Sequence, residues 1–404
     1  MIDDTKLANS LYDEAENIRF ANLPTFASMM SPIEIAKAFD APVQRGSATG
    51  REASRTILAG LAGALSLSRL SQRSEAPSLT NATTLPLKID THHHFIPDFY
   101  REAIDTAGGD PAGIPTPNWT LQTTLDHLET NNVRKAYLSL TTPGPTIAGP
   151  NTTTIRQLAR RANEYAASLV AAHPSKLGFF ASLPSPLDDP TGTLAELTYA
   201  VDTLHADGVT LFTRYGPDNT YLGHPSFQPL WSALNARRAV AFIHPTTAAC
   251  NEWINHVLPP PMLDFPAETT RAAIDMIMGN VTRAFPDVTR ILSHAGGTLP
   301  FLISRIAVTA GAVQQPNVTV YGKTYAEWME GVRSFYYDLA LVGTPGVLGL
   351  VLGTVEPGRV VYGSDFPYAN ADKVAGYREY LDEYAMDEEL RNGIYFGNAE
   401  RLLG

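Results

Sequence analysis

The 404-residue sequence has little cysteine, little positive charge and no long apolar run. Its single cysteine, Cys250, excludes an intramolecular disulfide framework and a cysteine-rich metal site. The 30 Lys and Arg residues are outnumbered by 41 Asp and Glu, and this excess argues against a nucleic-acid partner, whose phosphates need a basic face. Hydrophobic residues, at 44%, suffice for a sizeable core in one large domain or two average ones.

The most apolar early stretch is ILAGLAGALSL at residues 57–67. It is shorter than the roughly 20 residues that cross a membrane, and it begins too far from residue 1 for a secretory signal. We expect a short docking helix or a poorly ordered arm there. We also expect a soluble, cytoplasmic protein with no membrane partner.

The composition changes near residue 84. Residues 71–84 (SQRSEAPSLTNATT) have the small polar composition of a linker, and Ser31 with Glu34 forms the pattern of a capping box at a helix start. The sequence therefore predicts an N-terminal extension over 1–84, partly helical or disordered. A single domain over 85–404 is expected to follow it.

Beyond residue 85, short apolar runs alternate with amphipathic segments of helical period, such as 154–172 and 269–278. This alternation predicts parallel strands joined by helices, and eight such units fit a (β/α)8 TIM barrel of the α/β class. A doubly wound open sheet is the alternative. The eight expected strands are 88–91, 135–140, 177–182, 209–212, 240–243, 289–292, 335–338 and 360–362.

The first expected strand leads into three consecutive histidines. Alternate side chains of an extended chain share a face, so His92 and His94 point the same way and His93 points oppositely. Two imidazoles on one face can bind one divalent cation. A polar strand end without a metal is the competing explanation.

Three further strand ends carry residues of the same chemistry. His244 follows the fifth expected strand, His294 the sixth and Asp365 the eighth. Each alone could be ordinary, as a core histidine, a helix cap and a turn residue. On a barrel, however, these ends converge on one rim. We therefore predict a zinc site formed by His92, His94, His244 and Asp365, with His294 beside it able to move a proton.

Candidates for substrate contacts carry weaker signals. Arg214, after the fourth strand, could pair with a substrate carboxylate or belong to a surface loop. Tyr368, Trp119 and Trp253 could wall a substrate ring, although a packed loop anchor is the commoner role of such a Trp. Cys250 is expected to be inert. The other histidines are expected to be surface or packing residues without convergent partners: His127, His173, His205, His224 and His256.

Four motifs together resemble those of the amidohydrolase-related metal-dependent decarboxylases, the group typified by aminocarboxymuconate-semialdehyde decarboxylase. They are DTHHHFIP at 90–97, FIHP at 242–245, LSHAGG at 292–297 and YGSDFPY at 362–368. Three further segments look most like the fungal 6-methylsalicylate decarboxylases: DGVTLFTRYG at 207–216, YLGHPSF at 221–227 and FYYD at 335–338. The resemblance spans 85–404 and covers nothing of 1–84.

The resemblance implies zinc, or manganese as in some relatives, on the four residues named above. The fourth strand, VTLF, lacks the lysine of binuclear hydrolases, which favours a mononuclear site. The expected reaction is the non-oxidative decarboxylation of a small phenolic acid, of the type that converts 6-methylsalicylate to m-cresol. Such a reaction belongs to secondary metabolism. Asp365 would protonate the ring carbon while His294 polarises substrate or water.

Two other functions compete with decarboxylation. The same residues suit a hydrolase that opens a lactone or amide through a zinc-bound hydroxide, because the ligands are common to both reactions. The other competing possibility is a barrel that has lost its catalytic activity, and the intact set of histidines argues against it. The expected partner is a small aromatic acid. Because relatives are often dimers, a homodimer is possible.

Overall fold

The computed structural model describes residues 85–249, 257–309, 319 and 321–404. The predicted extension over 1–84, with its linker and its helix start at Ser31, lies outside the described residues. So do Cys250, Trp253 and His256. The predictions made for these residues therefore stay predictions.

Eight parallel strands form one sheet that closes on itself. Closure joins the first strand to the segment after the last, where the Thr91 amide donates to the Tyr362 carbonyl at 3.0 Å and the Asp365 amide to the His92 carbonyl at 2.8 Å. The chain is thus a (β/α)8 barrel and not an open sheet. In sheet order the strands are β1 (Lys88–Phe95), β2 (Val133–Leu140), β3 (Leu177–Ser182), β4 (Gly208–Phe212), β7 (Val240–His244), β8 (Thr289–Leu292), β9 (Tyr336–Asp338) and β10 (Val360–Val361).

All eight predicted strands are present, and the largest difference in their bounds is at β1. The sequence predicts a strand that stops at Thr91, whereas β1 continues through the three histidines to Phe95. Polar residues interrupt an apolar pattern, so periodicity alone ends the strand early. In the folded chain each of these imidazoles finds a hydrogen-bond partner, which permits their burial.

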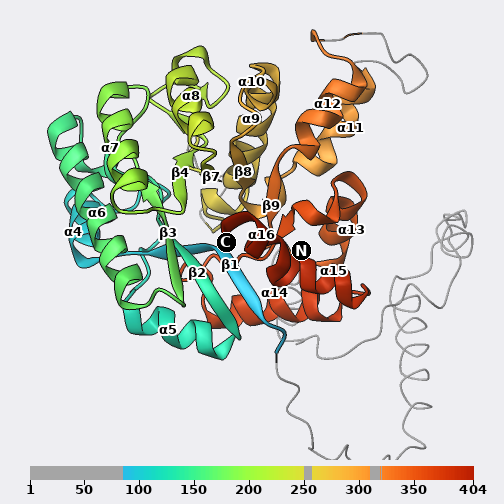
Figure 1. Ribbon diagram of the computed structural model, residues 1–404, viewed down its shortest axis with the longest axis horizontal. Coiled ribbons are helices and arrows are strands. Elements are labelled where there is room, and N and C mark those ends of the chain that lie inside the picture. The colour runs from blue at the N-terminus through green and yellow to red at the C-terminus, as the bar shows by residue number, and fades with distance from the viewer. Residues whose placement is uncertain (1–84, 250–256, 310–318, 320) are drawn as a thin grey trace, which may run out of the picture. The chain divides into compact units, whose positions relative to one another are not determined.

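Helices form the layer outside the strands (Figure 1). Several begin at a capping side chain: Thr120 accepts from the Thr123 amide, Asn151 from Thr153 and Asp189 from Gly192. Both predicted helical segments are found, as α6 and α9. The helices are α4 (Asp98–Thr106), α5 (Leu121–Thr130), α6 (Thr152–Ala172), α7 (Pro190–Asp202), α8 (Gln228–Ala236), α9 (Asp264–Met278), α10 (Val281–Ala284), α11 (Leu299–Thr309), α12 (Tyr325–Arg333), α13 (Pro345–Thr354), α14 (Ala371–Glu383), α15 (Glu388–Asn392) and α16 (Asn398–Leu403).

Aromatic side chains fill the interior of the barrel. Phe180 of β3 stacks between Tyr137 and Phe242, with ring centroids 5.5 and 5.6 Å away. The last helix, α16, adds Ala399 to this buried layer. The interior is therefore packed, and a ligand can enter only at a rim. Among the described helices none has the length and apolarity needed to cross a membrane.

Truncating the central ring tests the importance of this packing. Phe180 is 1% exposed, so Phe180→Ala should leave a cavity and lower the free energy of unfolding by about 3–5 kcal/mol. Phe301→Ala on α11 is the matched control, because that ring is 69% exposed and its loss should cost less than about 0.5 kcal/mol. Urea unfolding of both variants measures the difference, and equal costs would contradict the packed interior.

Candidate metal centre

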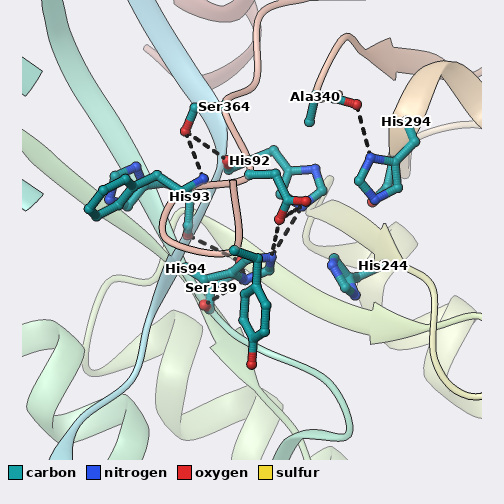
Figure 2. Close-up of polar contacts among 12 residues, drawn as sticks. His92, His93, His94, Ser139, His244, His294, Ala340 and Ser364 are labelled. Carbon is teal, nitrogen blue, oxygen red and sulfur yellow. Dashed lines mark hydrogen bonds and ion pairs between the residues drawn. The ribbon is translucent and has the colours of Figure 1, made fainter. Parts of the chain in front are cut away.

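The four predicted metal ligands meet at one end of the barrel. His92 and His94 come from β1 and His244 ends β7 (Figure 2). Asp365 follows β10. All four are buried, and each places a donor atom within 4.8 Å of the others. His92 Nε2 lies 3.2 Å from His94 Nε2, and Asp365 Oδ1 lies 3.4 and 3.3 Å from these two nitrogens. The structure thus brings together the residues that the strand ends indicated.

Each of the three imidazoles is oriented through its other nitrogen. Nδ1 of His92 lies 2.9 Å from Asp338 Oδ2, that of His94 lies 3.2 Å from the Ser139 carbonyl, and that of His244 lies 2.7 Å from the Pro245 carbonyl. Carboxylate and carbonyl oxygens only accept hydrogen bonds, so they favour a proton on Nδ1. The Nε2 lone pairs are thereby left facing the centre of the cluster, as metal ligands require.

The spacing of these atoms fits a metal ion. Lone-pair atoms only 3.2–3.4 Å apart repel one another unless a cation lies between them. Four ligands placed tetrahedrally at about 2.0–2.1 Å from zinc would be separated by about 3.3 Å. Three imidazole nitrogens and one carboxylate also match the ligand chemistry of zinc or manganese. The cluster can therefore hold one divalent ion.

The charges of the site favour the ligand forms of His94, His244 and Asp365, and a protonated His92 where no ion is bound. Burial lowers the pKa of His94 and of His244, which keeps both imidazoles neutral. Burial alone would raise the pKa of Asp365, but the surrounding imidazoles, His92 first among them, hold it well below its ordinary value. Burial likewise opposes a charge on His92, yet Asp338 and Asp365 outweigh it and raise the pKa of His92 to about 10. The two carboxylates thus require a positive charge between them, which a proton or a metal ion supplies.

His294 lies beside the cluster, as predicted. Its ring centroid is 4.9 Å from that of His92, and its Nδ1 lies 2.9 Å from the Ala340 carbonyl, so Nε2 is the nitrogen available for proton transfer (Figure 2). His294 and Asp365 both have left-handed backbones, with φ of 55° and 60°. Non-glycine residues rarely adopt this conformation, and it is characteristic of positions that the surrounding structure holds in place.

Asp338 is a functional residue that the sequence analysis did not assign. It ends β9, where one carboxylate oxygen bonds His92 Nδ1 and the other accepts the amides of His294 and Ala340 at 3.0 Å. It therefore orients a ligand and the neighbouring acid–base candidate at once. The available signal was an aspartate at the end of the seventh expected strand, on the same rim as the histidines.

The predicted substrate contacts lie at different distances from the cluster. The Tyr368 ring meets that of His94 edge-on at 5.8 Å. Trp119 is buried against Phe95 and Tyr165, and its Nε1 donates to Thr124, which is the packed-anchor arrangement.

Arg214 belongs to a two-stranded hairpin, β5 (Arg214–Tyr215) with β6 (Thr220–Tyr221). Its guanidinium donates to the carbonyls of Thr247, Gly216 and Asp218. With Phe212 and Thr246 it also lines a cavity of about 310 Å³. Thr246 follows the predicted ligand His244 by two residues.

The remaining histidines require one correction. His205 and His224 are exposed, as expected, and His173 is half-buried. His127 was predicted to have no convergent partner, but it is buried with its ring 5.4 Å from His93 and 4.4 Å from Phe366. This contact could not be predicted from the sequence because more than thirty residues of chain separate His127, on α5, from His93, on β1. His93 itself points away from the cluster toward Asp90 and Thr124, as strand alternation predicted.

The fold and the cluster define a barrel enzyme with a site for one divalent metal ion. The chain belongs to the amidohydrolase family, whose model matches residues 89–404.

Named relatives are similar to this chain over the same region. The 6-methylsalicylic acid decarboxylase of Penicillium expansum is 44% identical over 315 residues, which cover 78% of this chain and 95% of the relative. That of Aspergillus aculeatus is 44% identical over 300 residues, or 74% of this chain and 90% of the relative. The crystal structure of a dihydroxybenzoic acid decarboxylase from Polaromonas sp. JS666, with manganese and 2-nitroresorcinol bound, shares the fold; it is 21% identical with a TM-score of 0.67 and covers 79% and 97% of the two chains.

Replacing Asp338 tests the orientation of His92. Asp338→Asn keeps an oxygen for the backbone amides but can present an NH2 group to His92 Nδ1, which would move the imidazole proton to Nε2. We expect the affinity for zinc to fall about 10–100-fold in competition with a chelator. The control is Asp202→Asn on α7, whose carboxylate pairs with Arg237 at the surface. Equal affinities in the two variants would contradict the role of Asp338.

Proposed function

We propose that this protein is a metal-dependent, non-oxidative decarboxylase of a small phenolic acid of the 6-methylsalicylate type. The observation that carries the proposal is the converging set of His92, His94, His244 and Asp365 with His294 beside it. This set occurs in a chain 44% identical to a 6-methylsalicylic acid decarboxylase over most of its length. A decarboxylase suits these relatives better than the alternative lactone or amide hydrolase.

We propose zinc as the ion, with manganese as the alternative. Zinc suits three imidazoles and a carboxylate, whereas the manganese in the Polaromonas relative supports the second choice. When bound, the ion supplies Lewis-acid stabilisation and a template for the carboxylate and neighbouring phenol oxygen of the substrate. His92, His94, His244 and Asp365 would hold it. The absence of cysteine from the described site favours these harder metal ions over Cu(I).

The reaction requires a proton on the ring carbon that bears the carboxylate. Protonation there removes aromaticity, the bond from ring carbon to carboxylate then breaks, and its electron pair returns to the ring as CO2 leaves. Asp365 is the proposed proton donor. Because its pKa is held well below its ordinary value, it must first take up a proton from solvent and then pass that proton to the ring carbon. His294 is proposed to polarise the substrate or a water molecule through Nε2, because its Nδ1 is held by Ala340.

The substrate is proposed to occupy the rim between the cluster and the neighbouring cavity. Tyr368, edge-on to His94, would form one wall. Arg214 lines the cavity and would attract the acid, since a guanidinium pairs well with a carboxylate, although Glu268 already lies 3.7 Å from its Nε and would compete. Trp119 would contribute indirectly, by packing against Phe95 at the end of β1. A homodimer and a cytoplasmic location complete the proposal.

Metal analysis followed by incubation with 6-methylsalicylate tests this function. We expect about one zinc or manganese per chain and the formation of equimolar m-cresol and CO2, which cease after chelation and return with added metal. Metal without CO2, together with hydrolysis of a lactone or amide panel, would establish the hydrolase instead. Protein that binds no metal after supplementation would overturn both.

Two variants separate the roles of the acid–base candidates. Asp365→Asn should abolish CO2 release while part of the metal is retained, and His294→Ala should lower kcat at least about 100-fold with metal content unchanged. His224→Ala is the matched control, because this histidine is exposed and follows β6 by three residues, and it should leave kcat unaltered. Full turnover in His294→Ala would remove His294 from the reaction. Turnover in metal-loaded Asp365→Asn would exclude Asp365 as donor.

A further inference from the structure

The seam of the barrel, where β1 meets the segment 362–366 after β10, lacks a regular ladder. A single isolated bridge pairs His93 with Phe366. Three backbone bonds cross the seam, from the amide of Thr91 to Tyr362, from Asp365 to His92 and from His94 to Phe366. The Ser364 amide makes no bond to the backbone of β1. Of the four proposed ligands, His92 and His94 lie on one side of this seam and Asp365 on the other, while His244 comes from β7.

A buried carboxylate takes the place of the missing rung. Oδ1 of Asp90 accepts the amides of His92 at 3.1 Å and of Ser364 at 3.0 Å. Oδ2 accepts the Ser364 hydroxyl at 2.5 Å and lies 3.0 Å from His93 Nδ1. Asp90 is fully buried, and these four bonds use all of its lone-pair positions. The carboxylate is thus fully satisfied by groups from both sides of the seam.

Every group that Asp90 holds is next to a proposed ligand. Asp90 accepts the amide of His92 itself. It also accepts the amide and hydroxyl of Ser364, the residue before Asp365, and it contacts the imidazole of His93, which lies between His92 and His94. The His93 ring in turn stacks on Phe366, the residue after Asp365, with centroids 5.1 Å apart. The Ser364 hydroxyl also accepts the Phe366 amide at 3.1 Å. Asp365, with its φ of 60°, is consequently held on both sides in a conformation it would not adopt unaided.

We propose that Asp90 and Ser364 are a pair of positioning residues, which set the distance between Asp365 and the two histidines of β1. The proposal rests on the proposed function only in assigning these three side chains to one metal ion. A carboxylate at the seam can do this better than a backbone rung, because its two oxygens fix four donors at once whereas a ladder bond joins only two groups. Neither residue belongs to the proposed set of metal ligands.

Ser364→Ala tests the pair because it removes the hydroxyl bond to Asp90 and leaves the amide bond in place. We expect the affinity for zinc, measured by chelator competition, to fall about tenfold. The visible spectrum of the cobalt-substituted protein should change, since it reports the geometry of the ligands. With metal saturating, kcat should fall while KM changes less than about twofold. Ser364→Cys, which retains a weak donor of similar shape, should give values between Ala and the original protein.

The control removes an equally buried hydroxyl far from the seam. Thr193 of α7 donates to the carbonyls of Pro184 and Asp189, and Thr193→Val should lower the melting temperature without altering zinc affinity or the cobalt spectrum. The proposal would be overturned if Ser364→Ala kept the original zinc affinity and cobalt spectrum and lost only as much stability as Thr193→Val. Asp90 and Ser364 would then have a purely structural role.

If Ser364→Ala does not fold, Asp90→Asn is the second test. This substitution keeps the shape of the Asp90 side chain and replaces one of its acceptor oxygens by an NH2 donor. It should weaken zinc binding more than Ser364→Ala, and unchanged binding would overturn the proposal. The affinity and cobalt measurements need no turnover. A protein that binds metal and fails to release CO2 would therefore refute the proposed reaction while the role of Asp90 and Ser364 is still decided.

Discussion

Repulsion among lone pairs at the rim is the constraint on which the rest of the site depends. Nε2 of His92, Nε2 of His94 and Oδ1 of Asp365 lie within 3.2–3.4 Å of one another in a buried place. Such atoms separate unless a cation joins them or the surrounding structure holds them. The chain provides the second condition through acceptors on each Nδ1 and through Asp90 at the seam, so that the ion finds a site already formed.

The barrel explains why the ligands themselves could be predicted from the sequence. Strand ends are visible as apolar runs, and in a closed parallel barrel they must reach the same rim, so His244 and Asp365 could be placed together without knowing any distance. Strand alternation was enough to separate His92 and His94 from His93. These inferences use only chain direction and period, both of which a sequence displays.

The residues that orient the ligands could not be predicted in this way. The contact of His92 with Asp338 joins positions 246 apart in the chain, and it depends on the register and tilt of β9, which no local pattern encodes. Asp90 stands just before the three histidines, but its position in the sequence gives no sign of its bonds to Ser364, which is 274 residues away along the chain. Trp119 occupies an expected rim loop, but whether its ring turns to the core or to the site is decided by packing against Phe95 and Tyr165.

The position of the ligands along the chain also links metal binding to closure of the barrel. Two ligands belong to the first strand and one follows the last, so an ion bound by all of them would join the two sides of the seam at its least regular point. Its binding free energy would then stabilise the closed barrel as well as the site. Although β10 is short and only one isolated bridge lies beside it, three backbone bonds and the bond from the Ser364 hydroxyl to Asp90 cross the seam, and an ion bound there would add to them.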